Sequence, residues 1–303
     1  MSAIDELAAV GGARVSEHGP FGSRTTYRVG GSARVLVTIA TAADLDELGP
    51  LIAQTGLPIV CLGNGSNLLV EDGERNVLVV HFERSRATLE YDGDERVDVH
   101  VSAGLDLPLM ARRLAHHGVV GFEWAVGVPG TVGGAVVMNA GGHGDDVAGS
   151  LQEATVWRDG VTTVWSAAAL QLGYRTSALD AKDIVLAARF ALARGPVADA
   201  EERVRDIVRW RREHQPGGAN AGSVFRNPTG DHAARLIEAA GCKGLRLGSA
   251  AVSEKHANFI QADAGGLAVD VYALMGLVRA RVLEEFGVEL TCENRFVGFG
   301  IAP

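Results

Sequence analysis

The chain has 303 residues, 47% hydrophobic and 21% charged, a composition typical of a globular protein with room for two or three domains. Its net charge of -9 disfavours nucleic-acid binding, because such a surface repels polyanions. Three widely spaced cysteines argue against zinc ribbons, iron–sulfur clusters and disulfide frameworks, so we expect no metal site. The sequence shows no signal peptide and no span of about 20 apolar residues, so we expect a cytoplasmic protein.

In the first third of the chain, predicted strands surround a predicted helix. Val35–Ile39 and Val77–Phe82 favour strands, and Thr41 with Asp44 three residues later has the pattern of a helix N-terminus. Pro58–Leu62 is a short apolar segment typical of a buried strand. It runs directly into a glycine-rich loop.

That loop reads Gly63-Asn64-Gly65-Ser66-Asn67. Glycine lets the backbone approach a ligand closely, and successive N–H groups in such a turn form an anion-binding concavity. The loop lacks the Gly-Lys-Ser/Thr ending of a Walker A motif and does not open a helix with a GxGxxG pattern. From this loop alone, a diphosphate site of another kind and an ordinary tight turn are equally good interpretations.

The middle third favours hairpins. Asp-Gly dipeptides separate Thr88–Tyr91 from Val97–Val101, and Ala154–Trp157 from Val161–Trp165. A helix is predicted at Leu107–His117. A second glycine-rich stretch follows, from residue 127 to residue 144, with more glycines than a structural turn needs. Close packing of the backbone against a flat or phosphorylated ligand would explain them.

The last third contains predicted helices and short strands. Helices are expected at Asp199–Glu213, His232–Ala240 and Val269–Phe286, the last ended by Gly287, and strands at Asn258–Gln261, Val288–Leu290 and Phe296–Phe299. Hairpins mixed with helices, without regular βαβ alternation, predict an α+β fold. We place domain edges near residues 85 and 196, which gives domains 1–85, 86–196 and 197–303.

Three polar residues outside the glycine loops could carry chemistry. Arg175 follows a predicted turn, Ser223 lies in a loop between helices, and Glu293 lies in a segment fit for a strand. Each alone has an ordinary explanation, such as a surface ion pair or a turn cap. The sequence has no GxSxG motif, which disfavours a serine hydrolase.

The motifs resemble one known family. Leu62–Val70, Val128–Ala135 and Thr26–Gly31 are similar to the FAD-binding and amino-terminal signatures of the UDP-N-acetylenolpyruvoylglucosamine reductase (MurB) family. The resemblance spans nearly the whole chain. It implies a two-subdomain FAD-binding fold of the vanillyl-alcohol-oxidase (PCMH) type plus a carboxy-terminal α+β substrate domain. It also implies non-covalent FAD, with NADPH as the reductant of the enolpyruvyl group of a UDP-sugar.

The same resemblance implies roles for individual residues. Arg175 and Glu293 would stabilise the enolate formed by hydride addition, and Ser223 would protonate it. The implied cofactor-binding residues are Gly63, Asn64, Gly65, Ser66, Asn67, Pro129, Gly130, Thr131, Gly133, Gly134, Asn139, Ala140 and Gly141. The implied substrate-binding residues are Arg211, Arg212, Asn227 and His256.

Some questions stay open at this point. Arg205, Arg209 and Arg212 share a helix face that could meet a diphosphate, or could simply be solvated and paired with acidic neighbours. His143 is a possible flavin contact. The short Ala193–Ala200 connection leaves little room for the tyrosine-bearing loop found in some members of the family, so we expect the loop-less type II form. The oligomeric state is a separate question, for which a monomer is favoured. An FAD-dependent alcohol oxidase or a non-catalytic binding protein would be the rival functions.

Overall fold

A computed structural model describes residues 2–83, 87–300 and 303 of the chain, which form two compact units. The first unit is made of Met1–Glu17, Val35–Asn64 and Asn76–Arg211, and the second of His18–Arg34, Gly65–Arg75 and Arg212–Pro303. Each unit is therefore assembled from separate pieces of sequence.

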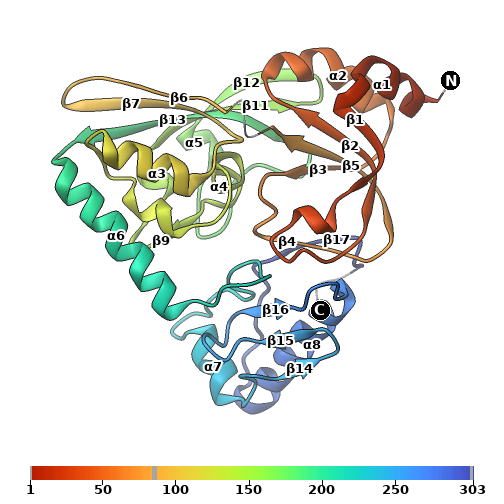
Figure 1. Cartoon of the computed structure of the whole chain (residues 1–303), viewed down its shortest axis with the longest axis vertical. Coiled ribbons are helices and arrows are strands. Elements are labelled where there is room, and N and C mark those ends of the chain that lie inside the picture. The colour runs from red at the N-terminus through yellow and green to blue at the C-terminus, as the bar shows by residue number, and fades with distance from the viewer. Residues whose placement is uncertain (1, 84–86, 301–302) are drawn as a thin grey trace. The chain divides into compact units, whose positions relative to one another are not determined.

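The helices and strands follow the order labelled in Figure 1. The α-helices are α1 (Ala3–Gly11), α2 (Ala42–Gln54), α3 (Leu107–His116), α4 (Val132–Met138), α5 (Ala167–Leu170), α6 (Val197–His214), α7 (Ala233–Ala239) and α8 (Ala268–Phe286). The strands are β1 (Val15–Pro20), β2 (Ser32–Ile39), β3 (Ile59–Leu62), β4 (Leu68–Val70), β5 (Glu74–Phe82), β6 (Leu89–Asp92), β7 (Arg96–Ser102), β8 (Val119–Val120), β9 (Gly141–Gly142), β10 (Asp145–Asp146), β11 (Leu151–Arg158), β12 (Val161–Ser166), β13 (Ile184–Arg194), β14 (Arg246–Leu247), β15 (Ala250–Val252), β16 (Ile260–Ala262) and β17 (Arg295–Val297).

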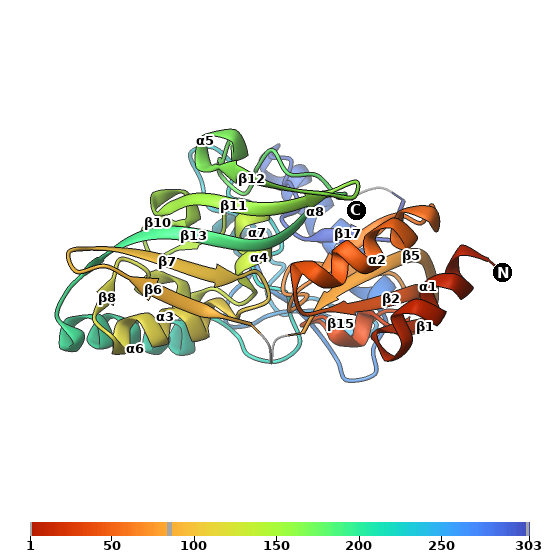
Figure 2. The same ribbon diagram turned by 90° about the horizontal axis from the view of Figure 1, so that it is seen from above.

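An antiparallel sheet is the main feature of the first unit. Its strands run in the order β12-β11-β13-β7-β6, with β8 added beside one end of β13, and Figure 2 shows them side by side in this order. Figure 1 shows α3 and α4 against one face of this sheet. Side chains of alternate residues along β7 and β13 are buried there, together with Met110, Leu114 and Val136 of the two helices. This packing fixes the segments that lead into and out of the second glycine stretch.

A smaller sheet carries the first glycine loop. Its strand order is β1-β2-β5-β3, and β3 runs parallel to β5. In α2, Thr41 and Asp44 form the predicted capping box, and Leu45, Leu48 and Ile52 are buried. Trp157 of β11 packs over Gly49 of this helix, where a Cβ atom would lie 2.8 Å from the indole ring. A larger residue at position 49 would displace the ring.

In the second unit, α8 packs on the antiparallel sheet β14-β15-β16. The buried face of α8 has helical spacing, from Val271 through Leu274, Met275 and Val278 to Val282, and the helix ends at Gly287 with φ 66°. In the same unit β17 pairs with β4 in parallel. That pairing joins the residues after Glu293 to the residues after the first glycine loop.

The α+β class is confirmed, and one predicted strand is wrong. Val288–Leu290 is irregular, and its neighbour Cys292 forms only an isolated bridge with Phe225. The predicted domain edge near residue 85 lies outside the described residues, and the three-domain division stays a prediction. Among the described residues, no helix is long and apolar enough to cross a membrane.

An ion pair at the end of β11 gives a stability prediction. The Arg158 guanidinium bonds both carboxylate oxygens of Asp183, whose side chain is 0% exposed. Burial alone would raise the pKa of Asp183, but the bonds from Arg158 and from the backbone of Asp180 outweigh it, so that the pKa is lowered. We expect Arg158→Met to lower the melting temperature by several degrees at pH 7, because it leaves a buried carboxylate without its charged partner.

The pH dependence follows from the sign of that shift. A carboxyl with a lowered folded pKa stabilises the protein above its unfolded pKa of about 3.9 and loses that contribution as the pH falls through the folded value. Thermal melts of the wild type and Arg158→Met should therefore converge as the pH falls below about 4. The control is Arg246→Met, which removes an exposed pair with Asp263. Equal losses in the two variants would contradict the prediction.

Candidate active site

The two glycine stretches meet within the first unit. Gly63 lies so close to Thr131 that a Cβ atom on it would be 2.3 Å from the threonine Oγ1. Beside it, Asn64 Nδ2 donates a hydrogen bond of 2.7 Å to Asp106 Oδ1. The start of the first glycine loop, Gly63 and Asn64, therefore lies beside residues at the start of the second stretch.

Part of the second glycine stretch is helical, which the sequence did not predict. Thr131 caps α4, and Gly133 packs so closely on Ala103 that a Cβ atom would be 2.9 Å from that methyl group. The backbone is held by bonds from Leu107 N to Gly130 O and from Val132 N to Leu105 O. Glycine is needed at residue 130, where φ is 134°. The stretch is thus a tightly fixed backbone surface.

These residues fit FAD. The Asn64 Oδ1 atom is buried and has no hydrogen-bond partner among the described residues, although its amide nitrogen is bonded. A buried acceptor without a partner is rare in a folded chain, and a polar ligand group would satisfy it. A side chain at Gly63 would fill the space between the two loops. The predicted cofactor residues of the first unit therefore form a suitable cradle for a flavin dinucleotide.

Arg175 lies against these cofactor residues. Its guanidinium donates to Gly141 O at 3.0 Å and to Asn139 O at 3.5 Å, and it stacks on the ring of Tyr174. The Arg175 backbone has φ 56°, a left-handed conformation that costs free energy for a residue with a side chain. The Asn139 side chain bonds Asp146, Gly173 O and Ala148 N, so it holds the loop together. A cation is thereby fixed beside the predicted flavin site.

Another part of the first unit brings Trp210 and Arg211 of α6 close to His143. Its ring packs edge-on against Trp210 of α6 at 5.1 Å, and its Nε2 lies against Gly127. Partial burial and the nearby Arg211 lower the pKa of His143. Burial also lowers the pKa of the Arg211 guanidinium. The first of the predicted substrate arginines therefore lies near the second glycine stretch.

The second unit brings Ser223 and Glu293 together. The Glu293 N–H donates a bond of 2.7 Å to Val224 O, Arg226 N donates to Thr291 O, and Phe225 bridges Cys292. Within the described residues, the Ser223 hydroxyl makes no hydrogen bond. Two of the three predicted catalytic residues thus lie on paired segments, with a hydroxyl available to a substrate.

Asn258 holds this pairing in place. Its Oδ1 accepts from Phe225 N at 3.0 Å, its Nδ2 donates to Phe225 O at 2.8 Å, and its backbone carbonyl accepts from Val224 N. The residue is 4% exposed. Neither Asn258 nor Asp106, the partner of Asn64, was predicted from the sequence as a site residue. Neither had a local signal, because both act on residues far away in the chain.

The remaining predicted substrate residues of the second unit have partly structural roles. Asn227 Oδ1 accepts from Ala233 N at the start of α7, which leaves its amide hydrogens without a described partner. His256 Nδ1 accepts from Asn258 N, so Nε2 carries the ring hydrogen, and burial lowers the pKa of His256. Arg212 O accepts a bond from Lys255 Nζ. None of these contacts excludes a ligand.

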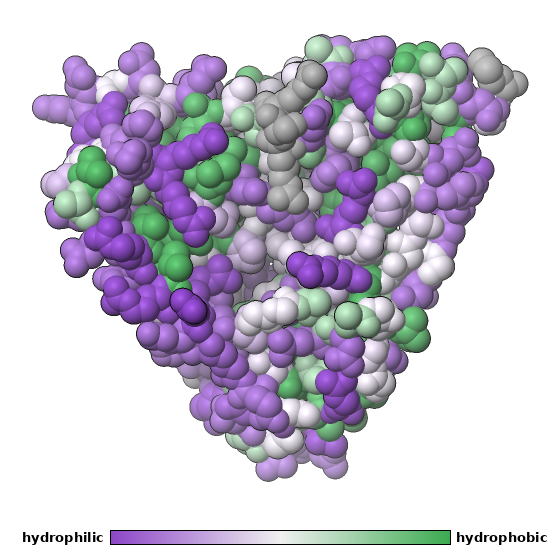
Figure 3. Space-filling view, in the orientation of Figure 1, coloured by the Kyte–Doolittle hydropathy of each residue, from purple (hydrophilic) through white to green (hydrophobic). Residues whose placement is uncertain are grey.

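The arginines earlier in α6 are solvated. Arg205 pairs with Glu201 at 3.8 Å and Arg209 with Asp206 at 3.1 Å, and both arginines are more than half exposed. Figure 3 shows a largely hydrophilic surface along this helix. The solvated alternative therefore holds for these two residues. The connection from β13 to α6 is only Gly195 and Pro196, which leaves no room for an inserted loop.

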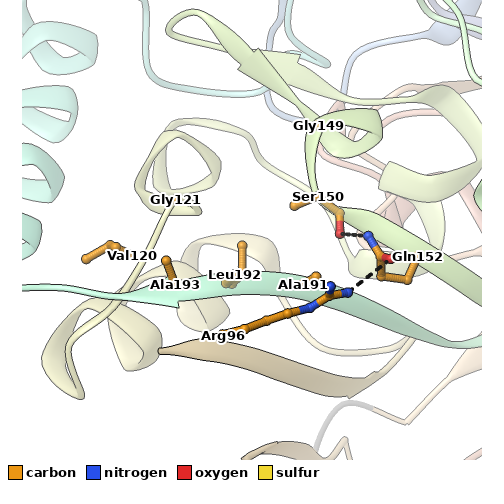
Figure 4. Close-up of a pocket in the computed structure, with 9 residues that line it drawn as sticks. All are labelled: Arg96, Val120, Gly121, Gly149, Ser150, Gln152, Ala191, Leu192 and Ala193. Atoms are coloured by element: carbon orange, nitrogen blue, oxygen red, sulfur yellow. Dashed lines mark hydrogen bonds between the residues drawn. The ribbon is translucent and has the colours of Figure 1, made fainter. Parts of the chain in front are cut away.

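A separate hollow lies elsewhere in the first unit (Figure 4). It has a volume of about 500 Å³ and lies at the end of β7 and β13 away from Asp106, with Arg96 bonded to Gln152. None of its lining residues is among those predicted for catalysis, cofactor or substrate. The described part of the chain also contains no group of three His, Cys, Asp or Glu that could hold a metal.

Comparisons with known proteins agree with this arrangement. Residues 33–164 match the FAD binding domain family, and residues 214–297 match the family described as UDP-N-acetylenolpyruvoylglucosamine reductase, C-terminal domain. A UDP-N-acetylenolpyruvoylglucosamine reductase of Chloroflexus aurantiacus is 39% identical over 92% of this chain and 96% of its own length. One from Symbiobacterium thermophilum is 41% identical over 94% and 92%.

A solved structure is also similar. The UDP-N-acetylenolpyruvylglucosamine reductase (MurB) from Thermus caldophilus has a TM-score of 0.79 and 36% identity, and the match covers 92% of this chain and 97% of that one. The matched FAD-binding range contains every predicted cofactor residue, and the matched carboxy-terminal range contains Ser223 and Glu293. The predicted fold, an FAD-binding part followed by a second α+β part, is thereby confirmed.

Proposed function

The chain belongs to the UDP-N-acetylenolpyruvoylglucosamine reductase family, and we propose that Arg175, Ser223 and Glu293 carry its chemistry. It is an FAD-dependent oxidoreductase that uses NADPH to reduce the enolpyruvyl group of UDP-N-acetylenolpyruvoylglucosamine to UDP-N-acetylmuramate, in the synthesis of peptidoglycan precursors. Bound FAD supplies the transfer of a hydride from NADPH to the substrate. The protein residues bind the substrate, stabilise charge and deliver a proton.

The pairing of the Ser223 and Glu293 segments is the observation that carries the proposed roles. Hydride addition to the methylene carbon of the enolpyruvyl ether leaves negative charge on the carbon that bears the carboxylate. Arg175 stabilises that enolate by its positive charge, and Glu293, as the neutral acid, by donating a hydrogen bond. Fixed groups aimed at developing charge typically contribute about 10²–10³ in rate each.

Ser223 completes the reaction by giving its hydroxyl proton to that carbon. The group is suited to this role because its hydroxyl has no competing partner among the described residues. A serine hydroxyl is a weak acid, and a strongly basic carbanion-like centre matches it. The serine then regains a proton from water.

The UDP-sugar would be held by Arg211, Arg212, Asn227 and His256. Guanidinium groups suit a diphosphate, the free amide hydrogens of Asn227 can donate, and His256 can donate through Nε2. None of the three cysteines forms a disulfide in the part of the chain that the structure describes, which supports a cytoplasmic location. A monomer remains our expectation, and light scattering on the purified protein would check it.

An anaerobic visible spectrum tests the function. Addition of NADPH should bleach the yellow flavin of the purified protein, and addition of UDP-N-acetylenolpyruvoylglucosamine should then restore the colour. Recovery with oxygen alone, or no recovery with the UDP-sugar, would favour an oxidase or a binding protein. A protein that takes up no FAD would overturn the assignment.

A further inference from the structure

Asn294, the residue after Glu293, is a buried polar side chain that the proposed chemistry does not use. It is 4% exposed. Its Nδ2 donates to Asn67 Oδ1 at 3.0 Å and to Ala221 O at 3.1 Å, and its Oδ1 lies 3.5 Å from the hydroxyl of Tyr27. Both amide hydrogens are therefore committed to other segments of the second unit.

Asn67 completes the connection from the cofactor side. It ends the first glycine loop, and its Nδ2 donates to Glu293 O at 3.1 Å while its own carbonyl accepts from Arg295 N at 2.9 Å. With the bond from Asn294, three hydrogen bonds join this one loop residue to the three consecutive residues 293–295. Both the side chain and the backbone carbonyl of Asn67 therefore contact the Glu293 segment.

The loop that contains Ser223 is hydrogen-bonded to the same segment, residues 293–295. Asn294 anchors Ala221, and the Glu293 N–H anchors Val224, so Ser223 lies between two fixed backbone positions. Tyr27 closes the network from another segment. It is 0% exposed, and burial raises the pKa of its phenol, which keeps the hydroxyl protonated and able to donate.

We propose that Asn67 and Asn294 form a positioning pair that sets Glu293 and Ser223 relative to the first glycine loop. The inference rests on the proposed roles of Glu293 and Ser223. Its physical basis is that catalysis by oriented groups is sensitive to small displacements, and a shift of about 1 Å costs about 10² in rate. The pair itself does not touch the reacting atoms.

Two variants at residue 294 test the pair. Asn294→Asp keeps the shape but replaces the donor with an acceptor that faces Asn67 Oδ1 and Ala221 O, and Asn294→Leu removes all three bonds. For both, we expect the rate of flavin reoxidation by the UDP-sugar to fall by about 10–10². Flavin reduction by NADPH and the FAD dissociation constant should change by less than about threefold.

Backbone hydrogen exchange gives a readout that is independent of catalysis. The backbone amides of Glu293 and Arg295 should exchange faster in both variants. The reason is that loss of the Asn294–Asn67 bond weakens the hydrogen bonds that Asn67 makes with Glu293 O and Arg295 N. Val282→Ala is the control, since it opens a cavity in α8 within the same core without touching the network. It should lower the melting temperature and leave reoxidation unchanged.

A double-mutant cycle separates the pair from its members. Asn67→Asp retains the acceptor for Asn294 but loses the donor to Glu293 O. If the two residues act as one unit, either single substitution already removes most of their joint effect. The reoxidation rate of the double variant, Asn67→Asp with Asn294→Leu, should then be less than about threefold below that of the slower single variant. Fully multiplicative effects would overturn the pairing.

The outcomes distinguish this inference from the proposed function. If exchange at Glu293 and Arg295 is unchanged, or reoxidation is unchanged while Ser223→Ala slows it, the positioning pair is wrong and the proposed function stands. If Ser223→Ala does not slow reoxidation, the proposed roles fail, and faster exchange in the Asn294 variants would then show a structural pair only.

Discussion

Replacing Ser223 with alanine is expected to slow the reoxidation of reduced flavin by UDP-N-acetylenolpyruvoylglucosamine by about 10²–10⁴. The variant lacks the hydroxyl that protonates the substrate carbon, and no other described residue bonds that hydroxyl in the folded protein. Flavin reduction by NADPH should stay within about twofold of wild type, because that half-reaction does not use the proton. Anaerobic stopped-flow absorbance of the two half-reactions measures both rates.

A matched control is available in the same unit. Ser249→Ala also removes one hydroxyl, which here bonds Asp270 and Leu267 N at the start of α8. It should reduce stability and leave the ratio of the two half-reaction rates at the wild-type value. If Ser223→Ala slows both half-reactions equally, the proton-donor role is wrong and the loss reflects a damaged flavin site.

Arg175→Met is expected to lower kcat/KM for the UDP-sugar by about 10²–10³, because it removes the cation that stabilises the enolate. The reduction of flavin by NADPH should change by less than about tenfold, since no negative charge develops on a substrate carboxylate in that step. Steady-state kinetics with varied UDP-sugar, together with the stopped-flow rates, will separate the two effects.

The control for this variant removes the same charge from the same unit. Arg189→Met breaks part-buried pairs with Glu153 and Asp98 on the antiparallel sheet, none of which is a predicted catalytic, cofactor or substrate residue. Its kcat/KM should remain near the wild-type value. An equal loss in both variants would mean that the net charge of the unit, and not the placement of Arg175, controls the rate.

Much of the fold was predictable from local signals. The capping box at Thr41 and the glycine that ends α8 mark helices through interactions a few residues apart, and both predictions are confirmed. A strand was expected after Arg175, but the bounds of β13 were not predicted, because the alanine-rich run IVLAARFALAR fits a helix or a strand equally well without a turn signal. Its pairing with β7 and β11 decides the conformation.

The helix α4 shows why the second glycine stretch was described only in part. Glycine disfavours helices locally, so the sequence predicted a loop throughout. Packing against Ala103 and the bond from Gly133 N to Ala103 O override that preference. The glycines here allow the helix to pack closely against the segment that contains Ala103. The distance between two such segments cannot be deduced from the sequence.

The candidate site was predictable only where motifs carried it. Arg175, Ser223 and Glu293 came from a resemblance over the whole chain, whereas Asn294 had no signal of its own. Its partner Asn67 lies 227 residues away in the sequence, and only folding reveals that their amides meet. Polar groups that act on one another across such separations lie beyond any local pattern.

The parallel pairing of β4 with β17 constrains how the protein can be made in the cell. Leu68 is translated early, but its strand partner Arg295 is among the last residues to be translated. The second unit is therefore incomplete until almost the whole chain has been made. A product of premature termination would expose the unpaired β4 and would lack Glu293. Assembly of the catalytic groups is therefore a late event of biosynthesis, and a chain that ends before Glu293 is expected to be inactive.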